Sequence, residues 1–479
     1  MANLGTVYLG SPAVAIAAGW THNCALLDGG GVKCWGRGKH GRLGYDSIDN
    51  RGDAAGEMAN LGTVYLGSPA VAIAAGGQHT CALLVGGSVK CWGMNNYGQL
   101  GYDSTDNKGG AAGEMANLGT VHLGSPAIAI AAGWYHTCAL LEGGSIKCWG
   151  FNNVGQLGYD STDEKGNAVG EMANLGTVYL GSPAIAIAVG SWHTCALLVG
   201  GNIKCWGMNN YGQLGYNSTD AKGDTAGDMA SLGTVYLGAQ VSSIAAGGQH
   251  TCVLLKGDGS KGGSAKGGSA KGGSAKGGSA KCWGHGSNGQ LGYDSTDDKM
   301  SNAAGAVNLG SPAVAIATGW FHTCAILKGA TVKCWGHGSN GELGYDSIDN
   351  KGDDAGEMAK LGAVAMVAAM VAPPSPPSPP SPPTPPPQSP SPDLPPPSPD
   401  LPPPSPPPRL PPLPPSPPLV PEYHDDHEGH EDAETSHVLI WSLCTLLPFC
   451  MLLAAALVLL YRRKARNDRG SGNAVLPSG

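Results

Sequence analysis

Apolar and polar positions alternate over short stretches in the first three quarters of the chain. No stretch there keeps the 3.6-residue apolar period of an amphipathic helix. In one representative segment, Gly-rich turns separate four runs: "TVHLG" (120–124), "AIAIAAG" (127–133), "HTCALL" (136–141) and "IKCWG" (146–150). Short apolar runs bounded by glycines are typical of strands. The segment therefore predicts four antiparallel β-strands.

The last two of these strands predict a hairpin whose tip is Gly143 and Gly144. Folding about that tip places Cys138 opposite Cys148, and directly opposed residues are close enough for a disulfide. The cysteine pair recurs along the chain, which predicts six hairpin disulfides. The predicted pairs are Cys24 with Cys34, Cys81 with Cys91, Cys138 with Cys148, Cys195 with Cys205, Cys252 with Cys282, and Cys324 with Cys334.

One pair is wider than the others because four copies of KGGSA, residues 261–280, separate Cys252 from Cys282. A Gly/Ser/Lys segment of this kind is a flexible coil without a fold of its own. Lengthening a closed loop this much costs only about 1 kcal/mol of closure entropy. A hairpin tip that accepts such an insertion is not expected to form a binding site.

The whole unit repeats. Its first cysteine recurs every 57 residues from Cys24 to Cys252, and a sixth unit follows at Cys324. Four antiparallel strands per unit at this period are the signature of propeller blades. We therefore predict an all-β fold over residues 1–372, a propeller of six or seven four-stranded blades built from six repeats.

The segment "AAGWYHTCALLEGGSIKCWGFNNVGQLGY" resembles the repeat of the regulator of chromosome condensation family. The shared marks are the Gly-x-x-His start, the Gly turn, the Trp-Gly pair and the closing Gly-Gln-Leu-Gly. The resemblance covers roughly residues 1–370 and implies a propeller, usually of seven blades. This chain departs from the pattern in having six units, fragments of a unit at both ends, and a cysteine pair in every unit.

A proline-rich segment, residues 373–421, follows the repeats with runs such as "PPSPPSPPSPPTPPP". Such a run cannot donate ladder hydrogen bonds, so it predicts an extended polyproline II stalk. It resembles the hydroxyproline-rich stalks of plant and green-algal wall glycoproteins. A plain linker, or a ligand for proline-reading domains, is the alternative.

An acidic and His-rich spacer, residues 422–437, then precedes 24 largely apolar residues, 438–461. As a helix these residues span about 36 Å, which is enough to cross a hydrocarbon core. The basic tail at residues 462–479 predicts a cytoplasmic C-terminus and hence an extracellular propeller.

No signal peptide is recognisable at the start, because "MANLGTVYLGSPA" copies the internal sequence at 58–70. We take the chain to begin inside a blade, with its true N-terminus missing. The alternative is a tail-anchored protein with a cytosolic propeller. Six disulfides favour the extracellular topology, since such bonds persist in oxidising compartments. The sequence Asn217-Ser218-Thr219 is a candidate glycosylation site that agrees with secretion.

Two residue types recur in every unit and are predicted to be structural. They are a histidine after the first Gly (His22, His79, His136, His193, His250 and His322) and the tryptophan of each Cys-Trp-Gly. A residue needed in every blade is expected to hold that blade in place rather than to bind a metal or catalyse. The acidic connector, for example 102–114, is predicted to be a solvated turn, with a weak calcium site as the less favoured alternative.

The positions that differ between units are more informative. The dipeptide before each histidine varies, as do the residues after Trp-Gly, such as 94–97 and 151–154. On loops these positions would expose aromatic and amide groups suited to a sugar or a protein partner. Neutral drift after duplication is the alternative. The predicted ligand-binding residues are Trp20, Trp134, Tyr135, Trp192, Trp320 and Phe321.

The sequence offers no phosphate loop, no Gly-x-Ser-x-Gly elbow and no isolated nucleophilic cysteine. We therefore expect neither an enzyme nor a bound cofactor or metal. A net charge of −8 does not favour nucleic acid. The predicted function is a membrane-anchored, receptor-like propeller that binds cell-wall carbohydrate or protein. The alternative that the resemblance implies is a nucleotide exchange factor for a small GTPase.

Overall fold

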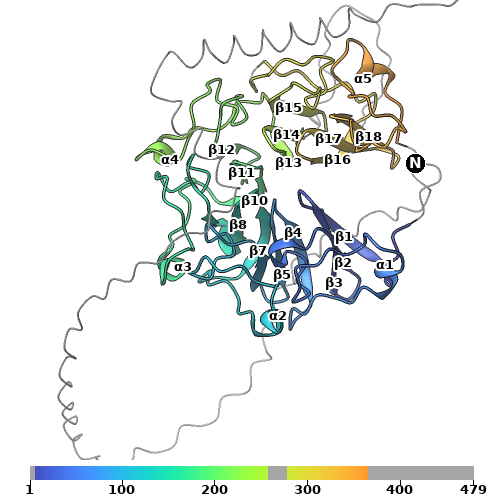
Figure 1. The fold of residues 1–479 in the computed structure, drawn as a ribbon. Coiled ribbons are helices and arrows are strands. Elements are labelled where there is room, and N and C mark those ends of the chain that lie inside the picture. Colours follow the sequence, from blue (N-terminus) through green and yellow to red (C-terminus); the bar gives the residue numbers. More distant parts are fainter. Residues whose placement is uncertain (1–5, 257–277, 302, 365–479) are drawn as a thin grey trace, which may run out of the picture. The chain divides into compact units, whose positions relative to one another are not determined.

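The computed structural model describes residues 6–256, 278–301 and 303–364, all within the unit Met1–Pro380. Six antiparallel sheets follow one another in chain order, and we number them as blades 1 to 6 (Figure 1). Each sheet has three strands, and the second strand along the chain lies in the middle.

The strands occupy equivalent positions in every repeat. The first strands are β1 (Ala13–Ala18), β4 (Ala70–Ala75), β7 (Ala127–Ala132), β10 (Ala184–Val189), β13 (Val241–Ala246) and β16 (Ala313–Thr318). The middle strands are β2 (His22–Leu27), β5 (His79–Leu84), β8 (His136–Leu141), β11 (His193–Leu198), β14 (His250–Leu255) and β17 (His322–Leu327). The third strands are β3 (Val32–Gly36), β6 (Val89–Gly93), β9 (Ile146–Gly150), β12 (Ile203–Gly207), β15 (Ala280–Gly284) and β18 (Val332–Gly336).

Helical structure within the described residues is limited to single turns. The α-helical turns lie in the connectors that follow blades 1, 2, 3, 4 and 6: α1 (Glu57–Asn60), α2 (Glu114–Asn117), α3 (Glu171–Asn174), α4 (Asp228–Ser231) and α5 (Glu357–Lys360). Two 3₁₀ turns, Lys39–Gly41 and Glu142–Gly144, occupy loops of blades 1 and 3. None of these helices is long and apolar enough to cross a membrane. The predicted stalk, spacer, membrane helix and tail, residues 373–479, lie outside the described residues.

The predicted hairpin register is confirmed. In blade 3, Cys138 faces Cys148 and Leu140 faces Ile146. The six cysteine pairs are all joined in the structure, with Cα atoms 4.0–4.1 Å apart. Cys252 and Cys282 keep this geometry despite their sequence separation of 30. The Gly/Ser/Lys insertion falls almost wholly outside the described residues.

The prediction of four-stranded blades is wrong for the described residues. The segment at 120–124 forms no strand, although the N–H of Val121 donates to the carbonyl of Val89 at 2.8 Å. That single hydrogen bond ties the segment to the outer strand of blade 2. Gly124, in the left-handed region at φ +76°, turns the chain away before a ladder can propagate.

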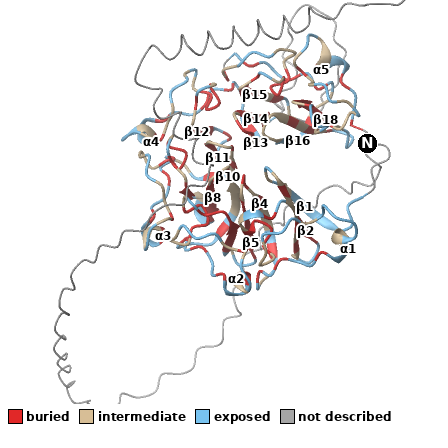
Figure 2. Ribbon diagram, viewed as in Figure 1, coloured by how far each residue is buried: buried red, intermediate tan, exposed pale blue. Residues whose placement is uncertain are grey.

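The hydrophobic core lies between successive blades rather than within each one. Trp92 of blade 2, for example, packs with Leu26 and Val32 of blade 1 and is fully buried. The equivalent tryptophans of blades 3 to 6 are fully buried as well, which confirms their predicted packing role. Blade 1 differs, because its first strand β1 is largely exposed (Figure 2) and Trp35 is only partly buried.

The disulfides can be tested by comparing two cysteine pairs. Replacing Cys138 and Cys148 by alanine (C138A/C148A) should lower the free energy of unfolding by about 3 kcal/mol on the chain-entropy model. The disulfide between Cys252 and Cys282 closes a longer loop. Its removal in C252A/C282A should therefore lower the free energy of unfolding by about 1 kcal/mol more. Denaturant unfolding of both variants measures the difference. All four cysteines are equally buried, so packing losses cancel, and equal losses would contradict the entropic account.

Candidate functional site

The six aromatic residues predicted to bind a ligand lie together in the structure. They come from the turns before the middle strands of blades 1, 3, 4 and 6. The ring centroid of Trp134 lies 5.1 Å from Trp20, 3.9 Å from Trp320 and 5.6 Å from Trp192. We call this group, with the neighbours described next, the aromatic cluster.

The other two predicted residues, Tyr135 and Phe321, lie against these tryptophans, and two further rings complete the aromatic cluster. Tyr135 lies 5.7 Å from Trp134, and Phe321 stacks on Trp320 at 5.6 Å. Tyr97 and Phe151, which are 4.6 Å apart, come from the loops after Trp-Gly. These last two lie at positions noted as variable but were not predicted as site residues. Their spacing in sequence gives no sign that they meet Tyr135.

The aromatic cluster depends on two glycines in the blades that lack an indole at this position. A Cβ added at Gly77 of blade 2 would lie 2.2 Å from Cδ1 of Trp134. One added at Gly248 of blade 5 would lie 1.7 Å from Cδ1 of Trp320. Blades 2 and 5 therefore leave the space that indoles of blades 3 and 6 fill.

A buried arginine borders the aromatic cluster on the side of blades 1 and 2. Arg42 donates to the hydroxyl of Thr21 and to the Oε1 of Gln78, each at 2.9 Å. The amide of Gln78 in turn donates to the hydroxyl of Tyr135 at 3.3 Å. Burial lowers the pKa of Arg42 to about 10, so it stays charged at neutral pH. The Nε1–H of Trp134 is buried and has no hydrogen-bond partner among the described residues.

The recurring histidines hold neighbouring blades together, which confirms their structural role for five of the six. The Nε2 of His79 in blade 2 lies 2.9 Å from the Oγ1 of Thr137 in blade 3. That hydroxyl donates to the carbonyl of Gln99 at 2.8 Å, so it must accept the histidine Nε2–H. We call this chain of two hydrogen bonds the blade latch. It recurs from His22, His136, His193 and His250 to Thr80, Thr194, Thr251 and Thr323.

The blade latch is missing at the sixth position. His322 of blade 6 is only partly buried, and its ring bonds to no threonine within the described residues. The corresponding residue of blade 1 is Asn23. Blades 1 and 6 nevertheless contact each other through Trp20 and Trp320, whose rings are 5.6 Å apart.

The latch histidines predict a loss of stability in acid. Burial lowers the pKa of His79 to about 3, whereas the unfolded group titrates near 6.5. The unfolded state therefore binds more protons below pH 6.5. Stability is full above that pH and falls as the pH drops towards the folded pKa. The free energy of unfolding should fall by about 2–3 kcal/mol per latch histidine between pH 6.5 and 4.5.

The variant H79Q tests this, because glutamine keeps an N–H donor but does not titrate. Between pH 7.5 and pH 4.5 the free energy of unfolding should therefore fall less for H79Q than for the unmodified chain. The difference should be about 2–3 kcal/mol, the amount expected for one latch histidine. Denaturant titration at the two pH values gives the comparison. Parallel pH profiles for the two proteins would show that His79 does not couple folding to protonation.

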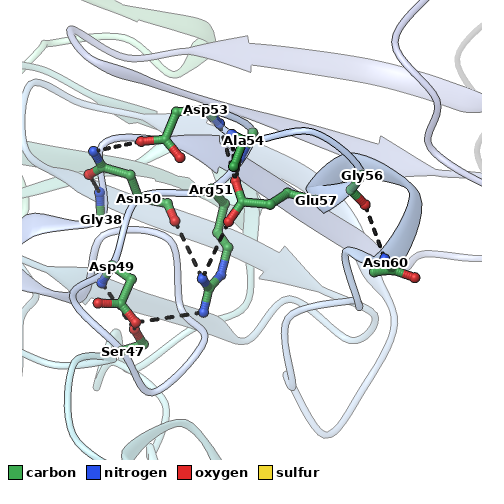
Figure 3. Close-up of polar contacts among 11 residues, drawn as sticks. Gly38, Ser47, Asp49, Asn50, Arg51, Asp53, Ala54, Gly56, Glu57 and Asn60 are labelled. Carbon is green, nitrogen blue, oxygen red and sulfur yellow. Dashed lines mark hydrogen bonds and ion pairs between the residues drawn. The ribbon is translucent and has the colours of Figure 1, made fainter.

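The carboxylates of the acidic connectors accept hydrogen bonds from backbone N–H groups of the same turn. Oε2 of Glu57 accepts hydrogen bonds from the N–H groups of Gly52, Asp53 and Ala54, and Arg51 lies 3.9 Å from Glu57 (Figure 3). Among the described residues, no group of three or more acidic, His or Cys side chains is placed to hold a metal ion. The connector is a hydrogen-bonded turn, as the favoured interpretation expected.

The candidate glycosylation residue stands apart from the other sites. Asn217 is exposed in the left-handed region, at φ +62°, where the other repeats have aspartate. The aspartates cap the helical turn of a later connector; for example, Asp46 accepts from the N–H groups of Gly113 and Met115. The connector that would face Asn217 has no such helix among its described residues. Glycosylation of Asn217 stays a prediction.

Comparisons with known proteins agree with this architecture. A family model described as "Regulator of chromosome condensation (RCC1) repeat" matches residues 13–42, 70–99, 127–156, 184–213 and 313–342. A second model with that description matches residues 86–140. The repeat that carries the Gly/Ser/Lys insertion is not among the matched segments. The chain therefore carries regulator of chromosome condensation repeats, arranged in a propeller-like fold.

Individual relatives share these repeats but differ in the functions that their names state. The ultraviolet-B receptor UVR8 of Arabidopsis thaliana is 27% identical over 388 residues, covering 70% of this chain and 79% of that protein. The probable human ubiquitin-protein ligase HERC4 is 31% identical over 207 residues, or 43% of this chain. This chain spans only 18% of HERC4.

Among solved structures, Prp20p of Saccharomyces cerevisiae is similar with a TM-score of 0.53 and 20% identity. The match covers 74% of this chain and 77% of Prp20p. Prp20p is described as a protein with binding properties towards Gsp1p and histones. At this level of identity the likeness concerns the fold.

Proposed function

We propose that this chain is a binding module that recognises a protein partner through the aromatic cluster. One observation carries the proposal: aromatic side chains from five blades converge at one place, and Trp20 there remains 53% exposed. Trp, Tyr and Arg are the residues enriched where binding energy concentrates in protein interfaces. The cluster and the arginine at its border combine all three.

Two polar features favour a partner that supplies hydrogen-bond acceptors. The Nε1–H of Trp134 is buried and has no partner among the described residues, and a buried donor without a hydrogen bond costs roughly 1–3 kcal/mol. Arg42 is buried, and among the described residues its guanidinium donates only to neutral acceptors. Both groups are buried, so a peptide carbonyl or a carboxylate of the partner would satisfy them once the side chains of the cluster move apart. The other ligand class to test is a carbohydrate, whose sugar rings would stack on the indoles.

The cell surface is the proposed location. Six disulfides and the exposed Asn217 support an oxidising compartment, and the predicted membrane helix at 438–461 would anchor the chain. The alternative is a tail-anchored cytosolic propeller that acts as an exchange factor for a small GTPase. The described binding of Prp20p to Gsp1p keeps this alternative worth a direct nucleotide-exchange assay.

The variant W20A tests the proposal. The full-length protein would be used to select binders from a random peptide library, and the affinities of the selected peptides would be measured. W20A should weaken binding at least tenfold, because a half-exposed indole at the cluster edge is removed with little loss of packing. The control is Y65A, which removes a similarly exposed aromatic residue outside the cluster and should leave affinity unchanged.

Three outcomes would redirect the proposal. Peptides that bind W20A and the unmodified chain equally would place recognition elsewhere. Binders found on a glycan array but not in the peptide library would make the ligand a carbohydrate. Faster nucleotide release from a small GTPase would favour the exchange factor.

A second function is favoured by the four tryptophans of the aromatic cluster. Indole is the side chain that absorbs ultraviolet-B light, and UVR8, a relative of this chain, is named as a receptor for it. The Trp134 and Trp320 rings are 3.9 Å apart, close enough for their excited states to interact. Light absorbed here would then alter contacts within the cluster.

The variant W134F tests this second function because phenylalanine keeps an aromatic ring but absorbs little ultraviolet-B light. Irradiation should change the near-ultraviolet circular dichroism of the unmodified chain and leave that of W134F nearly unchanged. A spectrum of the unmodified chain that is stable under illumination would remove light sensing from consideration.

A further inference from the structure

A loop of blade 6 places a serine, a histidine and a glutamate in one hydrogen-bonded line. The Oγ of Ser339 lies 2.9 Å from the Nε2 of His337. The Nδ1 of the same ring lies 2.5 Å from the Oε1 of Glu342. This is the order of contacts by which a carboxylate and an imidazole activate a serine.

The backbone of the loop decides which way the imidazole is protonated. The N–H of Asn340 donates to the Oε2 of Glu342 at 2.7 Å, which fixes the carboxylate with Oε1 facing His337. A carboxylate oxygen only accepts, so the Nδ1 of a neutral His337 carries the proton. Its Nε2 then holds a lone pair that points at the hydroxyl of Ser339. The histidine is oriented as a base for that serine.

Blade 5 contains a natural comparison, because its loop has the same sequence except for Gln290 in place of Glu342. There the N–H of Asn288 donates to the Oε1 of Gln290 at 2.9 Å, so the amide nitrogen faces His285. That nitrogen, 3.2 Å from Nδ1, can only donate. A neutral His285 therefore carries its proton on Nε2 and cannot act as a base there.

The serines of the two loops differ accordingly. Among the described residues Ser287 makes no hydrogen bond to His285; it accepts one from the Asn288 amide at 3.3 Å instead. The two loops thus differ in one atom, an oxygen of Glu342 where Gln290 has a nitrogen. Because of it, Ser339 is hydrogen-bonded to a histidine that can act as a base, and Ser287 is not. The blade 5 and blade 6 loops share every other residue from the tryptophan to the following Leu-Gly.

The blade 6 loop is also the more open of the two. A Cβ added at Gly341 meets no described atom within 4 Å, whereas one added at Gly289 lies 2.5 Å from the backbone nitrogen of Asp353. Ser339 is exposed. The ring of Phe321, at the edge of the aromatic cluster, lies 6.3 Å from His337. A reacting molecule would therefore meet an aromatic ring on the side of His337.

Hydrogen bonds keep the carboxylate ionised. Partial burial opposes ionisation of Glu342, but hydrogen bonds from its own backbone N–H, from His337 and from Asn340 hold its pKa below the ordinary value. The charged groups that face His337 are Glu342 on the same loop and, when protonated, His322 on strand β17. The ionised glutamate is the partner that the proposed proton transfer requires.

We propose that Ser339 is a nucleophile that His337 activates and Glu342 positions, and that it accepts acyl groups from activated aromatic esters. The Oγ of Ser339 forms a bond to the ester carbonyl carbon while its proton passes to the Nε2 of His337. The carbon–oxygen bond of the ester then breaks, and the leaving alcohol takes that proton. Water then attacks the acyl carbon while His337 takes a proton from it. The bond between the acyl carbon and the Oγ of Ser339 breaks, Oγ takes the proton back from His337, and the carboxylic acid leaves.

This inference does not depend on the proposed binding function, and it departs from the expectation that the chain is no enzyme. The test uses the full-length protein with a fluorophosphonate probe, and p-nitrophenyl acetate as the ester. Peptide mapping by mass spectrometry gives the rates at which Ser339 and Ser287 are modified in the same molecule. We expect Ser339 to react at least tenfold faster than Ser287.

The decisive variant is E342Q, which makes the blade 6 loop identical to that of blade 5. Glutamine already occupies the equivalent position in blades 2 to 5, as Gln99, Gln156, Gln213 and Gln290, so E342Q is expected to fold. Modification of Ser339 should fall to the rate of Ser287. S339A should lose the modification of this loop and leave that of Ser287 unchanged.

A spectroscopic readout separates positioning from a merely structural role. Nitrogen-15 shifts of the His337 ring at pH 8 should report a proton on Nδ1 in the unmodified chain and on Nε2 in E342Q. Equal reactivity of Ser339 and Ser287, or the same tautomer of His337 in both proteins, would overturn the proposal. Unchanged reactivity of Ser339 in E342Q would do so as well.

Discussion

The blade latch is the contact on which the rest of the structure depends. A buried histidine donates to a threonine of the next blade, and that threonine donates back to a carbonyl of the first blade. Both bonds are fully buried, and a missing partner there would leave a polar group without water or protein. The latch therefore fixes how consecutive blades meet, from blade 1 to blade 6. The core between blades packs against that fixed geometry.

The position of the aromatic cluster follows from the latch. In blades 1 to 5 the two residues before the histidine lie on a turn that the latch holds in place, so side chains on different blades are brought to one region. Trp320 and Phe321 of blade 6 join them by ring contacts. Gly77 and Gly248 then determine which indoles fit, because a Cβ at either position would overlap the neighbouring tryptophan. The repeated strands form the framework, and residues that vary between repeats, before the histidine and after Trp-Gly, form the candidate site.

Where the latch is missing, the chain is more exposed. His322 makes no bond to a threonine among the described residues, β1 is largely exposed, and no described atom lies within 4 Å of a Cβ built on Gly341 in the loop that carries Ser339. The loop of blade 5 is covered by the connector around Gly352 and Asp353. Nearly the same loop sequence thus lies in two environments within one protein. Of these two loops, the exposed one carries the glutamate.

Local sequence signals determined the hairpins, their register and the position of every cysteine pair, because alternation and Gly turns act between residues close in the chain. The predicted fourth strand at 120–124 did not form, since one hydrogen bond and Gly124 cannot sustain a ladder. The sequence also singled out Trp20, Trp134 and their companions as variable, but only the packing of one blade against another brought them together. The difference between Glu342 and Gln290 is visible in the sequence. Its effect on His337 follows from the turn that places one carboxylate oxygen against the ring, and that geometry exists only in the folded chain.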